Sequence, residues 1–223
     1  MHRLANAPTA GSPTTTTTRR TLLTTGAAAL ATLALPALPG RAGAQARLLQ
    51  PTPGQTEGPF YPLSLPADSD FDLLRNGGAT YSQGQPAWVE GTVRDTAGKP
   101  VVGAVVEIWQ CDHAGHYHHP GDGGRADPAF QGFGRVVVGP DGNYRFRTLR
   151  PAAYAGRTPH IHVKVRLDRK DLLTTQLYVA GDPGNQRDFL WRRLSEEGRA
   201  ALTAPFTATS DGLQARFPLI VQA

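Results

Sequence analysis

The residues of greatest chemical interest in this chain are two histidines one residue apart, His160 and His162, in the segment HIHVKVRL. Side chains of a strand alternate between its faces, so both imidazoles project from one side and the hydrophobic residues at 161, 163, 165 and 167 from the other. At a rise of ~3.3 Å per residue the two Cα atoms lie about 6–7 Å apart, which suits two ligands of one metal ion. The alternative is a solvated strand face, because Lys164 and Arg166 continue it.

A second group of possible ligands lies upstream, in WQCDHAGHYHHPGD. Its members are Cys111, His113, His116, Tyr117, His118 and His119. A tract rich in His and Cys indicates, by itself, zinc or copper. The alternative is a polar loop, which we favour for His118 and His119.

The elements that must position these residues are short strands separated by turn signals. We predict strands at 87–95, 104–110, 160–167, 173–181 and 215–221, and two more around GPDG at 139–142 that form a hairpin. Residues 185–202 have helical character. Short strands at roughly ten-residue spacing favour an all-β fold, an antiparallel β-sandwich with one short helix in its C-terminal half.

The segment GTVRDTAGKPVVGAVVEI, at 91–108, matches a β-arch found in transthyretin-like (prealbumin-like) sandwich modules. Many such modules only bind or space other groups, so this pattern defines the fold class better than the function. A non-catalytic binding module whose His-rich loop takes up zinc or copper is therefore the main alternative to an enzyme. Another enzyme on the same sandwich, with a different metal, is a third.

The N-terminal residues have the composition of an export signal. Residues 1–46 contain no acidic residue, and Arg19-Arg20 precede an apolar stretch at 22–38 and the small residues AQA at 44–46. The arginine pair followed by TLL resembles a twin-arginine signal. We predict an export signal at 1–46, an extended arm at 47–86 and a β-sandwich catalytic domain at 87–223. The expected location is periplasmic or extracellular, with no stable membrane anchor after cleavage.

Charge and cysteine content narrow the possible partners. The chain carries a formal +5, but four of its 23 basic residues and none of its 18 acidic ones lie before residue 47, which leaves net +1 for the rest. A near-neutral domain without a basic patch argues against a nucleic-acid partner. The single cysteine, Cys111, excludes an intrachain disulfide. A homo-oligomer stays open.

Several of these motifs, taken in order, resemble one enzyme family. GTVRDTAGKPVVGAVVEIWQ, then AGHY, then GRVVVGPDGNYRFRTLRPAAYAGRTPHIH is similar to the intradiol ring-cleavage dioxygenases, the protocatechuate and catechol dioxygenase group. The resemblance covers roughly residues 56–182. In that family two tyrosinates and two histidines hold a non-haem Fe(III).

The resemblance implies a set of site residues. The Fe(III) ligands would be Tyr117, Tyr154, His160 and His162. Arg157 would lie beside the catechol ring and stabilise its developing charge, Gln176 would lie on the next strand, and Tyr154 would take one of the substrate's protons. TEGPFYP resembles an arm that reaches the substrate pocket, with Gly58, Pro59 and Tyr61 near the substrate. Trp109 we assign to the core.

The ligand types agree with the metal. Fe(III) is a hard, highly charged ion that anionic phenolate oxygens stabilise, whereas two histidines and a carboxylate would suit Fe(II). Tyrosine has a pKa near ~10, so its ionisation at neutral pH needs the charge of a metal beside it. The resemblance thus implies insertion of both atoms of O₂ into a small catechol-type substrate. The product would be a cis,cis-muconate, with no nicotinamide required.

Overall fold

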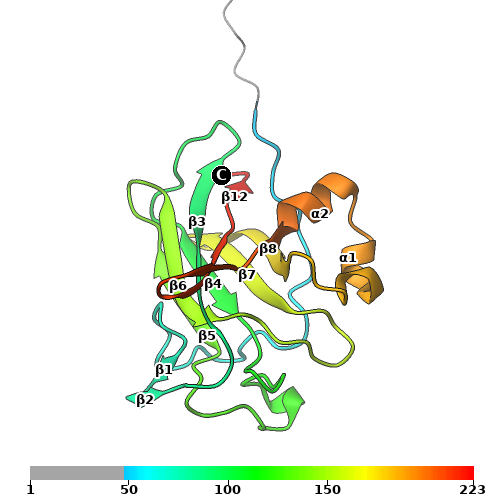
Figure 1. The fold of residues 1–223 in the computed structure, drawn as a ribbon. Coiled ribbons are helices and arrows are strands. Elements are labelled where there is room, and N and C mark those ends of the chain that lie inside the picture. The colour runs from blue at the N-terminus through cyan, green and yellow to red at the C-terminus, as the bar shows by residue number, and fades with distance from the viewer. Residues whose placement is uncertain (1–47) are drawn as a thin grey trace, which may run out of the picture. The chain divides into compact units, whose positions relative to one another are not determined.

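The computed structural model describes residues 48–223, so the predicted export signal lies outside the described residues. Two five-stranded sheets and a small pair of strands, β1 (Arg75–Asn76) and β2 (Ala79–Thr80), make up the fold (Figure 1). Within residues 48–223 no helix is long and apolar enough to cross a membrane. The prediction of an all-β fold is confirmed, in that strands dominate the described residues and the helices are short.

The first sheet has the strand order β10–β11–β3–β12. Strand β6 lies outside this order and pairs antiparallel with β3. Its strands are β3 (Pro86–Asp95), β6 (Asn143–Leu149), β10 (Thr207–Thr209), β11 (Gly212–Arg216) and β12 (Leu219–Val221). The predicted strand at 215–221 is divided at Pro218, whose missing N–H cannot continue a ladder. Both pieces run parallel to β3, so the sandwich is not purely antiparallel.

The second sheet has the order β5–β4–β7–β8–β9 and carries most of the candidate site. Its strands are β4 (Val105–Trp109), β5 (Phe133–Val137), β7 (His160–Leu167), β8 (Lys170–Val179) and β9 (Thr203–Ala204). All pairings are antiparallel except β8 with β9. Strand β3 belongs to one sheet and β4 to the other, so the predicted arch at 91–108 is confirmed.

The predicted hairpin around GPDG is wrong. A tight turn is present, closed by the Gly142 N–H donating to the Gly139 carbonyl at 3.0 Å. However, β5 pairs with β4 and β6 pairs with β3, so the turn crosses between the sheets. The buried side chains Val138 and Phe146 lie in the common core, which draws each strand to a different sheet. A local turn signal does not specify the partner of either strand.

The main hydrophobic core lies between the two sheets. From β7 it takes Ile161, Val163 and Val165, all fully buried, as the alternation predicts. His160, His162 and Lys164 of β7 are buried as well, because the other face of this sheet is covered there, whereas Arg166 is only partly buried. Strand β7 is therefore buried on both sides, unlike the half-solvated strand that was the alternative.

The helical segment at 185–202 is divided into three short pieces rather than one helix. They are η2 (Asn185–Arg187), α1 (Phe189–Arg192) and α2 (Glu196–Leu202). Asp188 accepts hydrogen bonds from the first N–H groups of α1, and Ser195 does the same for α2. These two N-caps interrupt the helical pattern.

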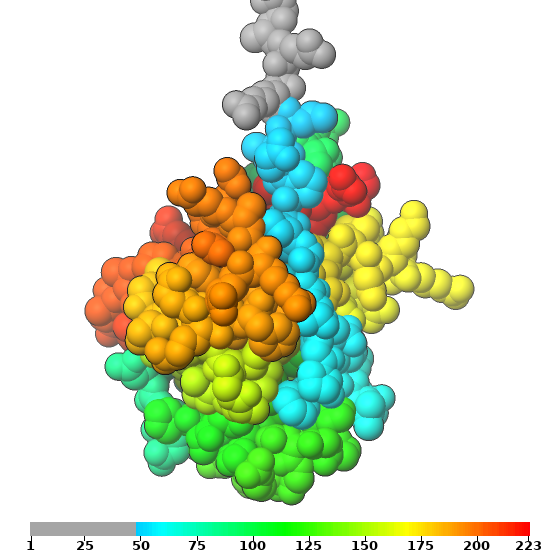
Figure 2. All heavy atoms as spheres, turned by 90° about the vertical axis from the view of Figure 1, so that its right-hand side faces the viewer, coloured from blue at the N-terminus to red at the C-terminus, as the bar shows by residue number. Residues whose placement is uncertain are grey.

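The arm first contacts one sheet and then the other, and at residues 71–73 it returns to β6 of the first sheet. The Thr52 N–H donates to the Ile220 carbonyl of β12, and the Gln55 N–H donates to the Thr174 carbonyl of β8. In Figure 2 the arm is the cyan band that passes between the orange helical segment and the yellow turn of β7 and β8. It therefore covers the face of β7 that carries the two histidines.

Candidate active site

The two histidines of β7 lie side by side beneath the arm, at 0% and 1% exposure for His160 and His162. Their Nε2 atoms are 3.2 Å apart. His160 Nδ1 is 2.7 Å from the Thr158 carbonyl, which can only accept, so Nδ1 carries the proton and Nε2 keeps a free lone pair. A backbone carbonyl that orients an imidazole in this way is typical of a metal-ligating histidine.

Two tyrosines complete the cluster from separate loops. Tyr117 follows β4 and is positioned by its N–H, which donates to Asp122 at 2.7 Å. Its hydroxyl is buried and has no hydrogen-bond partner among the described residues. The rings of Tyr117 and Tyr154 are 4.9 Å apart, and the Tyr154 hydroxyl is 3.5 Å from His160 Nε2. The structure thus brings all four predicted ligands together.

Gly115, in the motif AGHY, shows why this loop needs a glycine. It has φ +87°, which favours glycine, and a Cβ there would lie 3.0 Å from the Ala153 carbonyl and 3.4 Å from Tyr154 Cβ. The absence of a side chain lets the Tyr117 loop pack directly on the Tyr154 loop. The motif therefore positions the two phenols relative to each other.

Burial keeps the four groups neutral when no cation is present. It lowers the pKa of His160 to about 4 and that of His162 well below its ordinary value, with the Arg157 charge adding to the effect on both. It raises the pKa of Tyr117 well above the ordinary value and that of Tyr154 in the same direction. Neutral imidazole is the ligand form of histidine, whereas the phenols need a nearby positive charge to ionise.

The donor set fits a hard, highly charged cation. An unpartnered buried phenol and two facing imidazole nitrogens are costly unless something binds between them. Within residues 48–223, no three side chains of the His, Cys, Asp and Glu types could hold a metal ion together. A metal at this point would therefore depend on Tyr117 and Tyr154, and oxygen ligands of this kind favour Fe(III).

Arg157 and Gln176 lie beside this cluster and contact each other. The Arg157 guanidinium donates to Asp188 Oδ2 at 2.7 Å and to Gln176 Oε1 at 2.7 Å. Gln176 is the register partner of His162 on β8, so strand pairing places it there. Asp188, which is 1% exposed, was missed in the sequence because it lies 31 positions from Arg157 and carries no motif.

The arm supplies further contacts. A Cβ on Gly58, which has φ +73°, would lie 3.3 Å from His162 Cε1. Tyr61 donates its hydroxyl to Glu107 at 2.8 Å, and Pro59 is exposed. Phe60 lies in the same motif but was not among the predicted site residues, and its ring stacks on Tyr117 with 4.7 Å between the centroids.

Trp109, assigned to the core from sequence, belongs instead to the site face. It is the register partner of His162, and the two rings stack at 4.8 Å with 9° between their planes. It forms a small cluster with Cys111, Tyr117 and Phe133. The signal was available, because Trp109 has the same strand parity as Glu107, whereas Val106 and Ile108 face the core.

The other histidines stabilise their own loop. His118 Nε2 is 2.6 Å from the Phe130 carbonyl, His119 Nδ1 accepts from the Gly121 N–H at 3.0 Å, and His116 Nδ1 is 3.5 Å from Asp122. The contacts of His118 and His119 each use one ring nitrogen, whereas His116 Nδ1 has no hydrogen-bond partner among the described residues. The polar-loop interpretation of His118 and His119 agrees with them.

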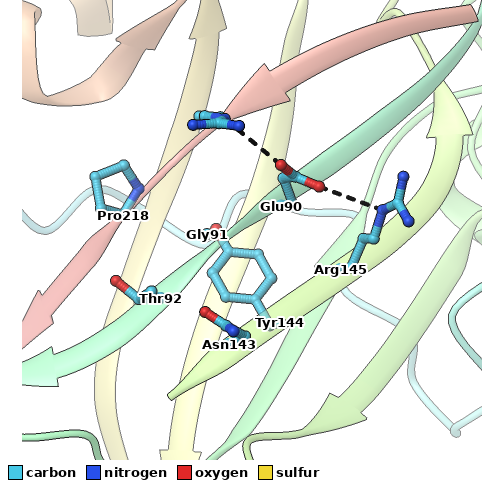
Figure 3. Close-up of a pocket in the computed structure, with 8 residues that line it drawn as sticks. Glu90, Gly91, Thr92, Asn143, Tyr144, Arg145 and Pro218 are labelled. Atoms are coloured by element: carbon cyan, nitrogen blue, oxygen red, sulfur yellow. Dashed lines mark ion pairs between the residues drawn. The ribbon is translucent and has the colours of Figure 1, made fainter. Parts of the chain in front are cut away.

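Two hollows differ in their relation to the cluster. One of about 410 Å³ opens at Tyr154 and Arg157, bounded by Thr158 and Arg187. A larger one of about 580 Å³ lies on the first sheet, around Glu90, Arg145 and Tyr144. Figure 3 shows it, with Glu90 between two arginines. Only the first hollow adjoins candidate ligands.

Comparison with known proteins agrees with this geometry. The family model described as Dioxygenase matches residues 56–221. The protocatechuate 3,4-dioxygenase beta chain of Burkholderia cepacia is 37% identical over 62% of this chain and 63% of its own length. Catechol 1,2-dioxygenase of Pseudomonas sp. strain EST1001 is 31% identical over 74% and 60%. The chain therefore spans about three fifths of these two relatives.

A solved structure extends the likeness to the fold. The dioxygenase domain of a dioxygenase and carbohydrate-binding protein fusion from Streptomyces sp. SirexAA-E has a TM-score of 0.63 and 32% identity, and the alignment covers 78% of this chain and 99% of that domain. An intradiol ring-cleavage dioxygenase of Tetranychus urticae matches with the same TM-score at 23% identity, which bears on the fold alone. The family match covers most of the described chain and contains every candidate ligand. This chain belongs to the intradiol dioxygenase family.

Proposed function

We propose that this protein is a non-haem Fe(III)-dependent intradiol dioxygenase. It cleaves a catechol-type aromatic with O₂ to a cis,cis-muconate-type product. The observation that carries the proposal is the buried meeting of Tyr117, Tyr154, His160 and His162 beside Arg157. Membership of the family and the names of its relatives support the same reaction class.

These four side chains would hold the iron. The iron would supply Lewis acidity toward a bound diol, which would favour loss of the diol's protons and raise the reactivity of its ring toward O₂. Tyr117 is the more buried phenol, so it is suited to a permanent ligand. Tyr154 is only partly buried and adjoins the 410 Å³ hollow, so it is the phenol that can leave and accept a substrate proton.

Arg157 and Gln176 act on the substrate. The guanidinium is held by Asp188 and Gln176 before substrate arrives, so it needs no reorganisation to stabilise negative charge on the ring. The arm, with Gly58 against His162 and Phe60 against Tyr117, excludes water from the inner side. The roles proposed for these side chains do not involve an external reductant.

Oxygen uptake with defined products tests the proposal. The purified protein is supplied with catechol, protocatechuate and hydroxyquinol in turn, and the product is analysed after reaction in ¹⁸O₂. We expect uptake with at least one of them and a dicarboxylic product cleaved between the two hydroxylated carbons, with both labelled atoms retained. Cleavage beside the diol, or no uptake with any catechol by an iron-loaded protein, would contradict it.

We also propose that residues 1–46 direct export by a twin-arginine route. The support is the arginine pair, the apolar stretch and the AQA site in the sequence. N-terminal sequencing of protein recovered outside the cytoplasm should begin near residue 47. Replacement of Arg19-Arg20 by Lys-Lys should retain the precursor inside the cell, and unchanged export would contradict the route.

A further inference from the structure

The five residues from Glu57 to Tyr61 form the part of the arm that crosses the candidate ligands. Gly58 lies against His162, and Phe60 stacks on Tyr117. This short segment, which we name the pocket strap (residues 57–61), makes no backbone hydrogen bond to a strand. Just before it, the Gln55 N–H bonds to β8 and Gln176 donates to the Thr56 carbonyl, so within the strap itself side chains hold the position.

The two ends of the pocket strap are each fixed by a buried polar partner. At its start, Glu57 pairs with the Lys164 ammonium, whose side chain is only 7% exposed. At its end, the Tyr61 hydroxyl donates to Glu107 at 2.8 Å, and Glu107 is 1% exposed. Both partners lie on the site face of the second sheet.

The two anchors belong to one network. Glu107 and Lys164 are register partners on β4 and β7, and the Lys164 ammonium lies 4.0 Å from the centroid of the Tyr61 ring. Arg166 lies 3.8 Å from Glu107 and 2.9 Å from Asp171, so the buried charges are paired. A buried charge is costly without a partner, and the arm supplies the nearer of the two carboxylate partners of Lys164.

We propose that Glu57, Lys164, Tyr61 and Glu107 are positioning residues that hold the pocket strap against the metal ligands. Phe60 of the strap lines a hollow of about 140 Å³ together with Trp109 and Tyr117, and the role is to make the strap a fixed wall of this inner side of the site. The strap belongs to the same site, so its expected effect on enzyme kinetics rests on the proposed function. None of the four touches a ligand directly, so they act through Gly58 and Phe60.

The experiment compares two substitutions, each of which removes the negative charge of one carboxylate partner of Lys164. Lys164 contacts Glu57 from the arm and also Asp171, at 3.8 Å, from β8. Glu57→Gln frees the strap, whereas Asp171→Asn removes the same charge without touching it. Hydrogen exchange of a peptide covering residues 52–61 reports the strap through its hydrogen-bonded Gln55 and Gly58 N–H groups, and a peptide from β7 reports the sheet.

We expect Glu57→Gln to raise exchange in the strap about tenfold with the β7 peptide unchanged, because local opening exposes only that segment. KM for the substrate should rise about fivefold, with kcat within about twofold, since the wall contacts bound substrate and not the reacting atoms. Tyr61→Phe should act in the same direction. Asp171→Asn should leave exchange and KM unchanged.

Unchanged strap exchange in Glu57→Gln would overturn the proposal. An equal effect of Asp171→Asn would do the same, because it would show a general loss of charge balance. If the wild-type protein cleaves no catechol, the proposed function fails, but hydrogen exchange still decides the anchoring.

Discussion

Two hollows in the described part of the chain, one on the first sheet and one beside Tyr154 and Arg157, contain similar residue types in opposite situations. On the first sheet, Glu90 lies 3.3 Å from Arg145 and 3.5 Å from Arg216, and these arginine side chains are 52% and 80% exposed (Figure 3). At the site, the Tyr117 hydroxyl and the His162 Nδ1 are buried without a partner among the described residues. The charged groups around the larger hollow are paired with one another, whereas the ligand cluster beside the smaller hollow keeps unpartnered groups.

This difference in unpartnered polar groups indicates which hollow lies beside groups that can bind a ligand and react. Exposed ion pairs contribute little to stability and leave nothing free to bind. Buried groups without partners are rare in folded proteins and mark places where a ligand completes the structure. The volume alone would have selected the wrong face of the molecule.

The largest expected contrast comes from removing one hydroxyl in each region. Tyr117→Phe should reduce turnover by at least about 100-fold, because it deletes a proposed ligand. It should not destabilise the metal-free protein, because that hydroxyl has no partner to lose. Activity, iron content and urea unfolding of the metal-free protein check both expectations.

Tyr144→Phe is the matched control for that substitution. The Tyr144 hydroxyl donates to the Phe217 carbonyl within the first sheet. Its loss should lower the free energy of unfolding by about 1 kcal/mol and leave activity unchanged. If both variants change activity and unfolding free energy in the same way, the proposed difference between the two regions is contradicted.

Arg157→Gln should have the next largest effect. We expect kcat to fall about 10- to 100-fold through loss of charge stabilisation on the ring. The free energy of unfolding should fall by about 3 kcal/mol, because buried Asp188 loses its ion pair. Arg145→Gln, which breaks an exposed pair, should change stability by less than about 1 kcal/mol and not affect kcat.

The contribution of Asp188 to stability should depend on pH, because its carboxylate is paired with Arg157 only when ionised. Burial raises the pKa of Asp188, but hydrogen bonds from Arg157 and from the backbone N–H groups of Trp191 and Thr158 outweigh it, so the net pKa is lowered. A lowered folded-state pKa gives stability that is present above the unfolded value of ~3.9 and is lost as pH falls through the folded value.

Wild type should therefore exceed Asp188→Asn in stability at pH 7, and the difference should shrink below about pH 4. Unfolding curves of both proteins between pH 7 and pH 3 measure this. A difference that stays constant down to pH 3 would show that the carboxylate charge does not matter there.

Glu90→Gln is expected to have the smallest effect. Its two partners are largely exposed, so the free energy of unfolding should change by less than about 1 kcal/mol, and less still at high salt. Oxygen uptake should be unchanged. A loss of activity here would mean that the first sheet takes part in the site after all.

Much of the site could be predicted from the sequence because its signals are local or ordered. Alternation in 160–167 placed both histidines on one face, and the structure has β7 over the same residues. The motif order suggested that Tyr117, Tyr154 and Arg157 would meet the histidines, and they do. Resemblance, rather than spacing, joined these separate loops.

Other features depend on partners that the sequence does not name. The turn at 139–142 was recognised, but the pairing of its strands depends on the shared core. The Asp188 contact with Arg157 and the Glu57 contact with Lys164 join segments far apart in the chain. The division of 215–221 was readable from Pro218, but the parallel pairing of its pieces with β3 was not.

The central claim is that two phenols and two imidazoles form a ferric site. Titration of metal-free protein with Fe(III), followed by metal analysis and visible absorption, tests it most directly. We predict one iron per chain and a red-brown tyrosinate charge-transfer band that changes in both Tyr117→Phe and Tyr154→Phe but not in Tyr144→Phe. A colourless iron-loaded protein, or a band that survives unchanged in both site variants, would contradict it.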